Sequence, residues 1–250
     1  MKIAKFEDLH CDAGWRTFSF LKVTTDDGLV GWSEYTEADG SRGLSSVIHG
    51  MAEGLIGLDP RAVQQIDSLL YVRQVQAPNG VNQRAMAAIG NALLDIKGKA
   101  LGVPVYELFG GPVRDRIPVY WSHCGTYRVR NAEAVGVPPL RPYDEVAALG
   151  AEVKRRGFKA LKTNPILFGQ GRPQMTNPGF RPGLELGRNG DPRLFDRIVE
   201  LLEAFRSGAG EDTALLLDVN FGFTPEALRQ LARRLEPLGL LWLEADMHAP

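Results

Sequence analysis

Three short aliphatic runs in the second half of the chain each lead into a charged residue, and this pattern restricts the fold most. The runs with their charges are Ala160-Leu161-Lys162, Leu215-Leu216-Leu217-Asp218 and Leu240-Leu241-Trp242-Leu243-Glu244. A continuous apolar run is typical of a strand that is buried on both faces of a parallel sheet. The carboxyl ends of such strands are where α/β barrels and open α/β sheets hold their chemistry. Two carboxylates and one ammonium at that edge indicate a divalent cation and an anionic substrate.

Helical patterns separate the apolar runs. We expect strands at 117–122, 158–163, 213–218 and 240–244, and helices at about 142–156, 191–206 and 224–235. Such alternation implies right-handed crossovers between parallel strands. Four strands of this kind are half of an eight-stranded (β/α)8 barrel, so the predicted fold class is α/β, with the first half of a barrel present.

Two features of the second half depart from a regular barrel. The segment 164–190 is rich in Gly, Pro and Asn and has no periodicity, so we expect a long loop there. The run at 240–244 would be an uncovered apolar edge if no strand followed it. We therefore expect the chain to be cut short after its fourth barrel strand.

The first 112 residues have a different organisation. Short β-prone runs at 2–10 and 17–24, and a third after the turn signal Asp27-Gly28, predict a three-stranded antiparallel sheet. Helical patterns follow, and Asn82 is a candidate N-cap of a long helix. Gly110-Gly111-Pro112 predicts a boundary, which gives an α+β domain at 1–112 and a barrel-like domain at 113–250.

Composition excludes several classes of partner. The net charge of −1 over 250 residues gives no drive toward nucleic acid or anionic membranes. No apolar run approaches the roughly 20 residues that cross a bilayer, and the N-terminus has no apolar signal core. We therefore expect a cytoplasmic protein without nucleic-acid or membrane partners, in which Cys11 and Cys124 are reduced.

The stretch Ala92–Gly111, with the sequence ALLDIKGKALGVPVYELFGG, carries a specific resemblance. It resembles the junction motif of the enolase superfamily, in the branch of mandelate racemase and muconate-lactonizing enzyme. The hairpin at 28–34 and the strand ends at 218–220 and 242–244 agree with it. The resemblance implies a capping domain followed by a barrel with three carboxylates on its third, fourth and fifth strands. Those carboxylates hold Mg²⁺, which stabilises the enediolate formed when the α-proton of a carboxylate substrate is removed.

Carried onto this sequence, the resemblance makes Asp218 and Glu244 the first two magnesium ligands and places the third beyond Pro250. Lys162 matches the first lysine of the family's Lys-x-Lys pair. Asn164 stands where the second lysine would act as acid or base, and an amide cannot exchange a proton at neutral pH. The family's other bases, on the sixth and seventh strands, would also fall beyond the sequence.

Further candidates surround these positions. His123, at the end of the first expected strand, either serves the reaction as a substrate contact or proton donor or is a packed structural histidine. Tyr127 could reach substrate from the same loop, and Asn220 either binds substrate or water or forms a turn. In the loop at 10–16, Trp15 would give the pocket an apolar wall and Arg16 an anion partner, unless the loop is a plain hairpin.

The function expected from these residues and the resemblance is that of a Mg²⁺-dependent lyase. The enzyme would be an acid-sugar dehydratase that abstracts an α-proton and eliminates water from a small carboxylate substrate. A racemase, epimerase or cycloisomerase of the same superfamily is the alternative, and a non-catalytic fragment or scaffold is another. The resemblance also implies a homo-oligomer.

Overall fold

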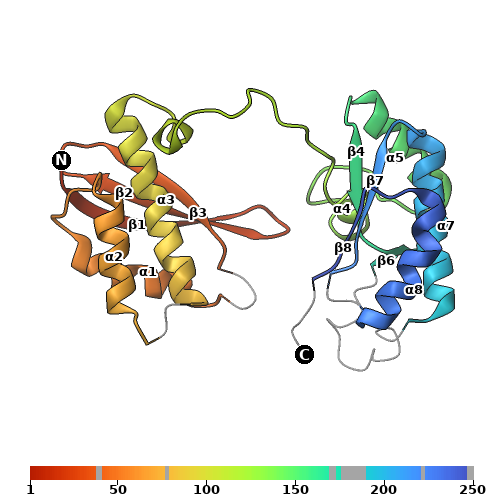
Figure 1. The fold of residues 1–250 in the computed structure, drawn as a ribbon, viewed down its shortest axis with the longest axis horizontal. Coiled ribbons are helices and arrows are strands. Elements are labelled where there is room, and N and C mark those ends of the chain that lie inside the picture. Colours follow the sequence, from red (N-terminus) through yellow and green to blue (C-terminus); the bar gives the residue numbers. More distant parts are fainter. Residues whose placement is uncertain (38–40, 77–78, 169–172, 176–189, 221–222, 247–250) are drawn as a thin grey trace. The chain divides into compact units, whose positions relative to one another are not determined.

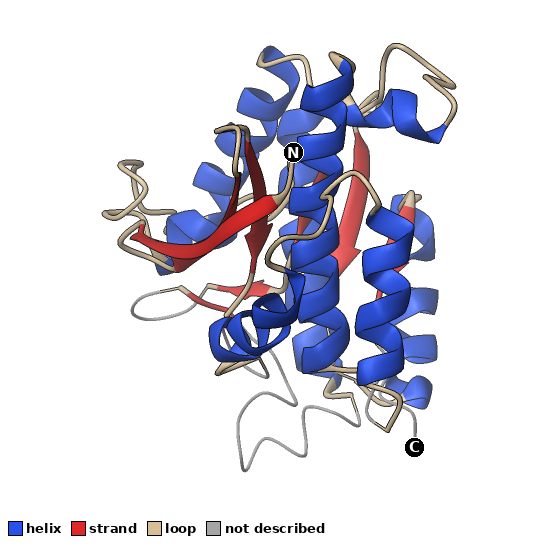
Figure 2. Cartoon of the chain, turned by 90° about the vertical axis from the view of Figure 1, so that its left-hand side faces the viewer, coloured by secondary structure: helices blue, strands red, loops and turns tan. Residues whose placement is uncertain are grey.

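The computed structural model describes residues 1–246 apart from 38–40, 77–78, 169–172, 176–189 and 221–222. The chain divides into two units, Met1–Asp115 and Arg116–Pro250. The first unit has its strands before its longer helices (Figure 1), whereas helices and strands alternate over residues 192–244 in the second. Figure 2 distinguishes the helices and strands of the chain by colour. The order of these elements agrees with an α+β unit followed by part of a (β/α) barrel.

The first unit contains the predicted three-stranded antiparallel sheet. Strands β1 (Ile3–Asp12), β2 (Thr17–Thr25) and β3 (Val30–Tyr35) lie in the order β1-β2-β3. The predicted turn before β3 is confirmed, because Gly28 has a φ of +86° and its N–H donates to Thr25 at 3.0 Å. Only glycine adopts such a φ without strain. The β1–β2 hairpin is longer than expected, since β1 continues to Asp12.

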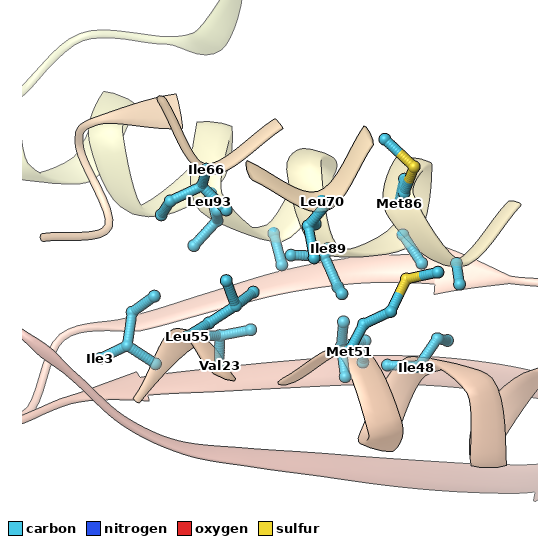
Figure 3. Close-up of a cluster of buried hydrophobic side chains, with 14 of the residues drawn as sticks. Ile3, Val23, Ile48, Met51, Leu55, Ile66, Leu70, Met86, Ile89 and Leu93 are labelled. Atoms are coloured by element: carbon cyan, nitrogen blue, oxygen red, sulfur yellow. The ribbon is translucent and has the colours of Figure 1, made fainter. Parts of the chain in front are cut away.

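Helices α1 (Leu44–Ala52), α2 (Val63–Arg73) and α3 (Val81–Leu101) complete this unit, with short 3₁₀ helices at Glu53–Leu55 and Val105–Phe109. Figure 3 shows side chains of α2 and α3, such as Leu70 and Ile89, directed toward Val23 and Ile48 from β2 and α1. One face of α3 is apolar and buried, since every member is at most 3% exposed: Ala85, Ala88, Ile89, Ala92, Leu93 and Ile96.

The prediction that Asn82 caps α3 is wrong. The helix begins at Val81, and Gly80 stands at the N-cap position without a side-chain hydrogen bond. Gly80 has a φ of +63°, a conformation that a glycine adopts readily. Asn82 is already helical, and its amide donates to Gln74 Oε1 at 3.2 Å.

The second unit is built on a parallel sheet. Strands β4 (Ala160–Thr163), β7 (Ala214–Asp218) and β8 (Trp242–Glu244) lie in the order β4-β7-β8. Helices α5 (Tyr143–Arg155), α7 (Pro192–Ala209) and α8 (Pro225–Leu235) lie together on one side of these strands (Figure 1), and Glu236–Leu238 forms a 3₁₀ turn. These strands and helices confirm three of the four predicted strands and all three predicted helices, with shifts of a few residues at their ends.

The prediction of a strand at 117–122 is wrong. Only Trp121 forms a parallel bridge, to Leu161, with hydrogen bonds of 3.0 and 2.9 Å on either side of it. The apolar residues that suggested a strand are exposed, with Ile117 at 74% and Val119 at 64%. An apolar side chain stabilises a strand only where a neighbouring layer buries it, and these have no such layer among the described residues. The chain then enters a short helix, α4 (Thr126–Arg130).

The predicted loop at 164–190 is partly structured. Strands β5 (Ile166–Leu167) and β6 (Gln174–Met175) pair in an antiparallel hairpin. Most of the rest of this segment lies outside the described residues. Among the helices that the structure describes, none is long and apolar enough to cross a membrane.

Two glycines bring α5 and α7 into backbone contact. A Cβ on Gly150 would lie 2.6 Å from the carbonyl oxygen of Phe205, and one on Gly208 would lie 1.7 Å from that of Ala147. Both distances are shorter than a carbon–oxygen contact permits, so only glycine fits at either position. The two helices that precede β4 and β7 are thus fixed against each other.

Candidate active site

Lys162, Asp218 and Glu244 come together at the carboxyl edge of the parallel sheet. Asp218 on β7 lies opposite Glu244 on β8 in the strand register. The Nζ atom of Lys162, from β4, lies 2.7 Å from Glu244 Oε2 and 3.5 Å from Asp218 Oδ2. The side chains of Lys162 and Asp218 are each 8% exposed, whereas that of Glu244 is 37% exposed. One ammonium therefore bridges two carboxylates at a site that is open on the Glu244 side.

The surroundings keep Lys162 charged. Burial acts to lower the pKa of Lys162, but the hydrogen bond to Glu244 and the negative charges of Asp218 and Glu244 raise it above the ordinary value. The ring of Tyr120 lies 5.6 Å from Nζ and adds a cation–π contact. The lysine is therefore a fixed positive charge and hydrogen-bond donor.

Asn220 follows a tight turn rather than the strand. Strand β7 ends at Asp218, and Asp218 Oδ1 accepts a hydrogen bond from the Asn220 backbone N–H at 2.9 Å. Asn220 has a φ of +49°, a conformation in which asparagine is enriched, and its carbonyl accepts from Asp246 N at 3.1 Å. The turn-forming interpretation of Asn220 thus describes its backbone, and a contact with substrate stays a prediction.

Asn164 connects two parts of the site. It is 3% exposed, and its Nδ2 lies 3.0 Å from the carbonyl oxygen of Asp218. Its Oδ1 lies 3.0 Å from His123 Nδ1 and accepts a hydrogen bond from Thr126 Oγ1, also at 3.0 Å. The amide thereby joins the loop after Trp121 to the end of β7. The amide cannot replace the family's second lysine as a proton carrier, and a catalytic role of Asn164 stays a prediction.

The other predicted residues fall in two groups. His123 has a φ of +50° and stacks edge-on against Tyr127, with ring centroids 5.4 Å apart. Both belong to the second unit: His123 lies in the loop before α4, and Tyr127 lies in α4 itself. Trp15 and Arg16 belong to the first unit, on the turn between β1 and β2, where the Arg16 guanidinium lies 4.2 Å from the Phe18 ring. Their substrate-binding roles stay predictions.

Sequence reasoning missed Tyr120 and Thr126. Tyr120 could not be selected, because its contact with Lys162 joins two segments that are far apart along the chain. Thr126 carried a weak signal, since it is the hydroxyl residue that follows Gly125 in the loop after His123. Its partner Asn164 is 38 residues away and is visible only in the folded chain.

The donor set at this edge suits a magnesium ion in part. Among the described residues, no three His, Cys, Asp or Glu side chains are arranged to hold a metal. Asp218 and Glu244 nevertheless direct carboxylate oxygens toward a common point, where the Lys162 ammonium offsets their negative charges. Mg²⁺ prefers hard oxygen ligands and is often held by one or two carboxylates with waters completing the shell. These two residues therefore fit the ion as a partial ligand set.

Comparisons with known proteins agree with this architecture. Residues 12–110 match the mandelate racemase / muconate lactonizing enzyme N-terminal domain, and residues 145–249 match the enolase C-terminal domain-like family. The chain is 41% identical over 249 residues to a D-galactonate dehydratase of Variovorax paradoxus, which covers 100% of this chain and 56% of that protein. It is 33% identical over 233 residues to a D-mannonate dehydratase of Novosphingobium aromaticivorans, covering 92% of this chain and 55% of that protein.

Solved structures give the same result. A protein of Burkholderia xenovorans, provisionally named an L-alanine-DL-glutamate epimerase, superposes with a TM-score of 0.94 at 39% identity, covering 100% of this chain and 63% of that one. A second structure with the same name, bound to magnesium and fumarate, superposes with a TM-score of 0.93. The chain spans about half the length of the curated relatives it matches. The chain belongs to the mandelate racemase and muconate lactonizing enzyme branch of the enolase superfamily.

Proposed function

We propose that the protein acts in Mg²⁺-dependent dehydration of a sugar acid, in which an α-proton is removed and water is then eliminated. The observation that carries this proposal is the convergence of Lys162, Asp218 and Glu244 at one edge of the sheet. Two carboxylates for a hard cation beside a fixed ammonium are suited to a substrate carboxylate whose negative charge grows during the reaction. The substrate class, a small polyhydroxy carboxylate, is part of the proposal.

The described residues divide the work. Asp218 and Glu244 would hold the magnesium ion, which when bound lowers the cost of the charge that develops on the substrate carboxylate. Lys162, held as an ammonium, would donate a hydrogen bond to that carboxylate and orient it. Asn164 is occupied by three hydrogen bonds and supplies no proton, so the base would come from another residue.

Dehydration is favoured over racemisation for two reasons. The curated relatives named above are dehydratases of galactonate and mannonate. The amide of Asn164 also stands where two-base racemases of this family would need a second lysine. The epimerase name of the Burkholderia structure supports the alternative, a racemase or epimerase with its base elsewhere. The family resemblance further implies a homo-oligomer, which light scattering of the purified protein would test.

The test combines binding with turnover. The protein is incubated with Mg²⁺ and a panel of sugar acids that includes D-galactonate and D-mannonate, and 2-keto-3-deoxy acids are quantified. We expect dehydration of at least one acid, reduced at least about 10²-fold by Asp218→Asn or Glu244→Gln. Glu211→Gln, which changes an exposed carboxylate away from the site, is the matched control. Formation of epimers alone would favour the alternative.

Binding of Mg²⁺, measured by calorimetry, separates the metal site from the reaction. We expect binding by the wild-type protein and by the Glu211→Gln control. The Asp218→Asn variant should bind at least tenfold more weakly, because it replaces a charged ligand by a neutral one. Equal affinity in the wild type and Asp218→Asn would count against the proposed site itself.

A further inference from the structure

The orientation of the Asn164 amide is dictated by a backbone atom. Asn164 Nδ2 lies 3.0 Å from the carbonyl oxygen of Asp218, and a carbonyl oxygen can only accept a hydrogen bond. The opposite orientation would place two oxygens 3.0 Å apart in a buried environment and leave the NH₂ group to face the wrong partners. The amide nitrogen must therefore face Asp218, and the amide oxygen must face the loop that carries His123.

This orientation determines which nitrogen of His123 carries the proton. Asn164 Oδ1 lies 3.0 Å from His123 Nδ1, and an amide oxygen offers only lone pairs. Nδ1 must therefore be the donor. The Thr126 hydroxyl also donates to Oδ1, and both bonds can coexist because a carbonyl oxygen has two lone pairs. A neutral imidazole has a single N–H, so the Nε2 atom of His123 bears the free lone pair.

We infer that Asn164 is a positioning residue that holds neutral His123 as its Nδ1–H tautomer and so makes Nε2 a hydrogen-bond acceptor. No hydrogen bond to Nε2 comes from the residues that the structure describes, and the ring is otherwise restrained by its edge-on contact with Tyr127. The backbone of His123 is in the left-handed region, with a φ of +50°. Asn164 therefore transfers no proton itself; it determines which nitrogen of His123 carries one.

The inference specifies what His123 can recognise. A lone pair on Nε2 attracts a hydroxyl hydrogen and repels the oxygens of a carboxylate. On the proposed function, on which this step rests, His123 therefore contacts a hydroxyl group of the sugar acid, while the carboxylate belongs to Lys162 and the metal ligands. The hydroxyl groups distinguish one sugar acid from another, so His123 is a candidate determinant of specificity.

Nitrogen NMR of the metal-free protein tests the tautomer without any turnover. The chain is labelled with ¹⁵N-histidine and studied at a pH about two units above the ordinary histidine pKa of roughly 6.5. The signals of His123 are assigned by their loss in His123→Gln. We expect a pyrrole-type shift for Nδ1 and a pyridine-type shift for Nε2. The reverse assignment in the wild-type protein would overturn the inference.

Variants then assign the effect to Asn164. Asn164→Ala, which removes the acceptor that faces Nδ1, should move pyridine character toward Nδ1. Thr126→Val is the matched control, since it removes the other donor to Oδ1 and should leave the tautomer unchanged. An unchanged tautomer in folded Asn164→Ala would overturn the inference. If circular dichroism shows that Asn164→Ala is unfolded, the wild-type spectrum decides, because Nδ1 must be protonated in it.

Kinetics test the recognition step separately. With the sugar acid that the panel identifies, His123→Gln should lower kcat/KM at least about tenfold, and less for an analogue in which the contacted hydroxyl is removed. Equal losses for every analogue would refute the hydroxyl contact while the tautomer result stands. If the panel yields no substrate, the proposed function has failed, and the NMR result still decides the role of Asn164.

Discussion

The ammonium of Lys162 lies 2.7 Å from Oε2 of Glu244, so a residue of β4 reaches past β7 to a residue of β8. The same nitrogen lies 3.5 Å from Asp218 Oδ2. Lysine has the length to span neighbouring strands, and its charge offsets the repulsion between the two carboxylates. A divalent cation bound by Asp218 and Glu244 would have to share this position or displace the ammonium.

Removing the Lys162 charge should therefore act in opposite directions on stability and metal binding. We expect Lys162→Met to destabilise the metal-free protein by about 3 kcal/mol, because it leaves two nearby carboxylates without their cation. The same change should strengthen Mg²⁺ binding severalfold, as repulsion between two cations is lost. Urea unfolding and calorimetry measure the two effects. Lys159→Met, which changes an exposed lysine just before β4, should alter neither; weaker Mg²⁺ binding by Lys162→Met would contradict the interpretation.

In the first unit, Asp8 should make stability depend on acid pH. A hydrogen bond from His49 lowers the pKa of Asp8 below its ordinary value of 3.8, and a 2.9 Å bond from His10 acts in the same direction. The unfolded chain then takes up a proton at a higher pH than the folded one, so stability falls as pH decreases below about 4. We expect Asp8→Asn to show a shallower loss in urea unfolding between about pH 5 and pH 3.

His49→Asn is the matched partner for that experiment. It removes the largest cause of the lowered Asp8 pKa, so it should flatten the same part of the stability profile. The double variant should differ little from Asp8→Asn alone, because loss of the Asp8 carboxylate already removes its bonds to both His49 and His10. Fully additive effects would show that Asp8 and His49 act independently.

The two cysteines should differ strongly in reactivity. Cys11 is exposed, whereas Cys124 is buried, and burial raises the pKa of its thiol. Because the thiolate is the reactive form, a thiol reagent should modify one cysteine rapidly in the native protein and the second only on unfolding. Cys11→Ser should abolish the rapid phase, which absorbance with a disulfide reagent would follow. Rapid modification of Cys124 in the folded protein would contradict its buried position.

Close packing of β3 against α3 gives a prediction on stability. A Cβ at Gly31 would lie 2.2 Å from the carbonyl oxygen of Ala92 and 2.6 Å from Ile96 Cγ1, so Gly31→Ala should destabilise by about 1–3 kcal/mol. In α1, a Cβ at Gly50 would meet no atom within 4 Å. Gly50→Ala should therefore stabilise the protein by about 0.5–1 kcal/mol, since alanine is the better helix former. Thermal unfolding of both variants checks the contrast.

The charged residues of the site could be selected from sequence because each follows an apolar run, and parallel strands bring their carboxyl ends to one edge. The structure does bring Lys162, Asp218 and Glu244 together at that edge, whereas the direct ion pairs between them were not predicted. Sequence reasoning could not show what Asn164 does. Its partners are His123, 41 residues away, and the backbone oxygen of Asp218, 54 residues away. A backbone atom has no sequence signature, so a bond to it appears only in the folded chain.

The wrong strand at 117–122 and the turn at Asn220, one of the two alternatives left open for that residue, have a common cause. Local pattern reports which residues favour a strand, but a strand also needs neighbours that accept its hydrogen bonds and cover its side chains. Ile117 and Val119 lack that cover and are exposed. Strand β7 ends at Asp218, so Asn220 lies beyond it. The hydrogen bond from the Asn220 N–H to the Asp218 side chain forms a turn at a position that the sequence pattern alone would continue as strand.

The contact of Gly150 and Gly208 with the facing helix has a consequence at a distance. Helices α5 and α7 lead into β4 and β7, whose far ends carry Lys162 and Asp218. The close approach of α5 and α7 at Gly150 and Gly208 thus influences the distance between the Lys162 ammonium and the Asp218 carboxylate, although neither glycine contacts these groups. A methyl group added there would push the two strand–helix pairs apart, and we expect the distance between Lys162 and Asp218 to lengthen as a result.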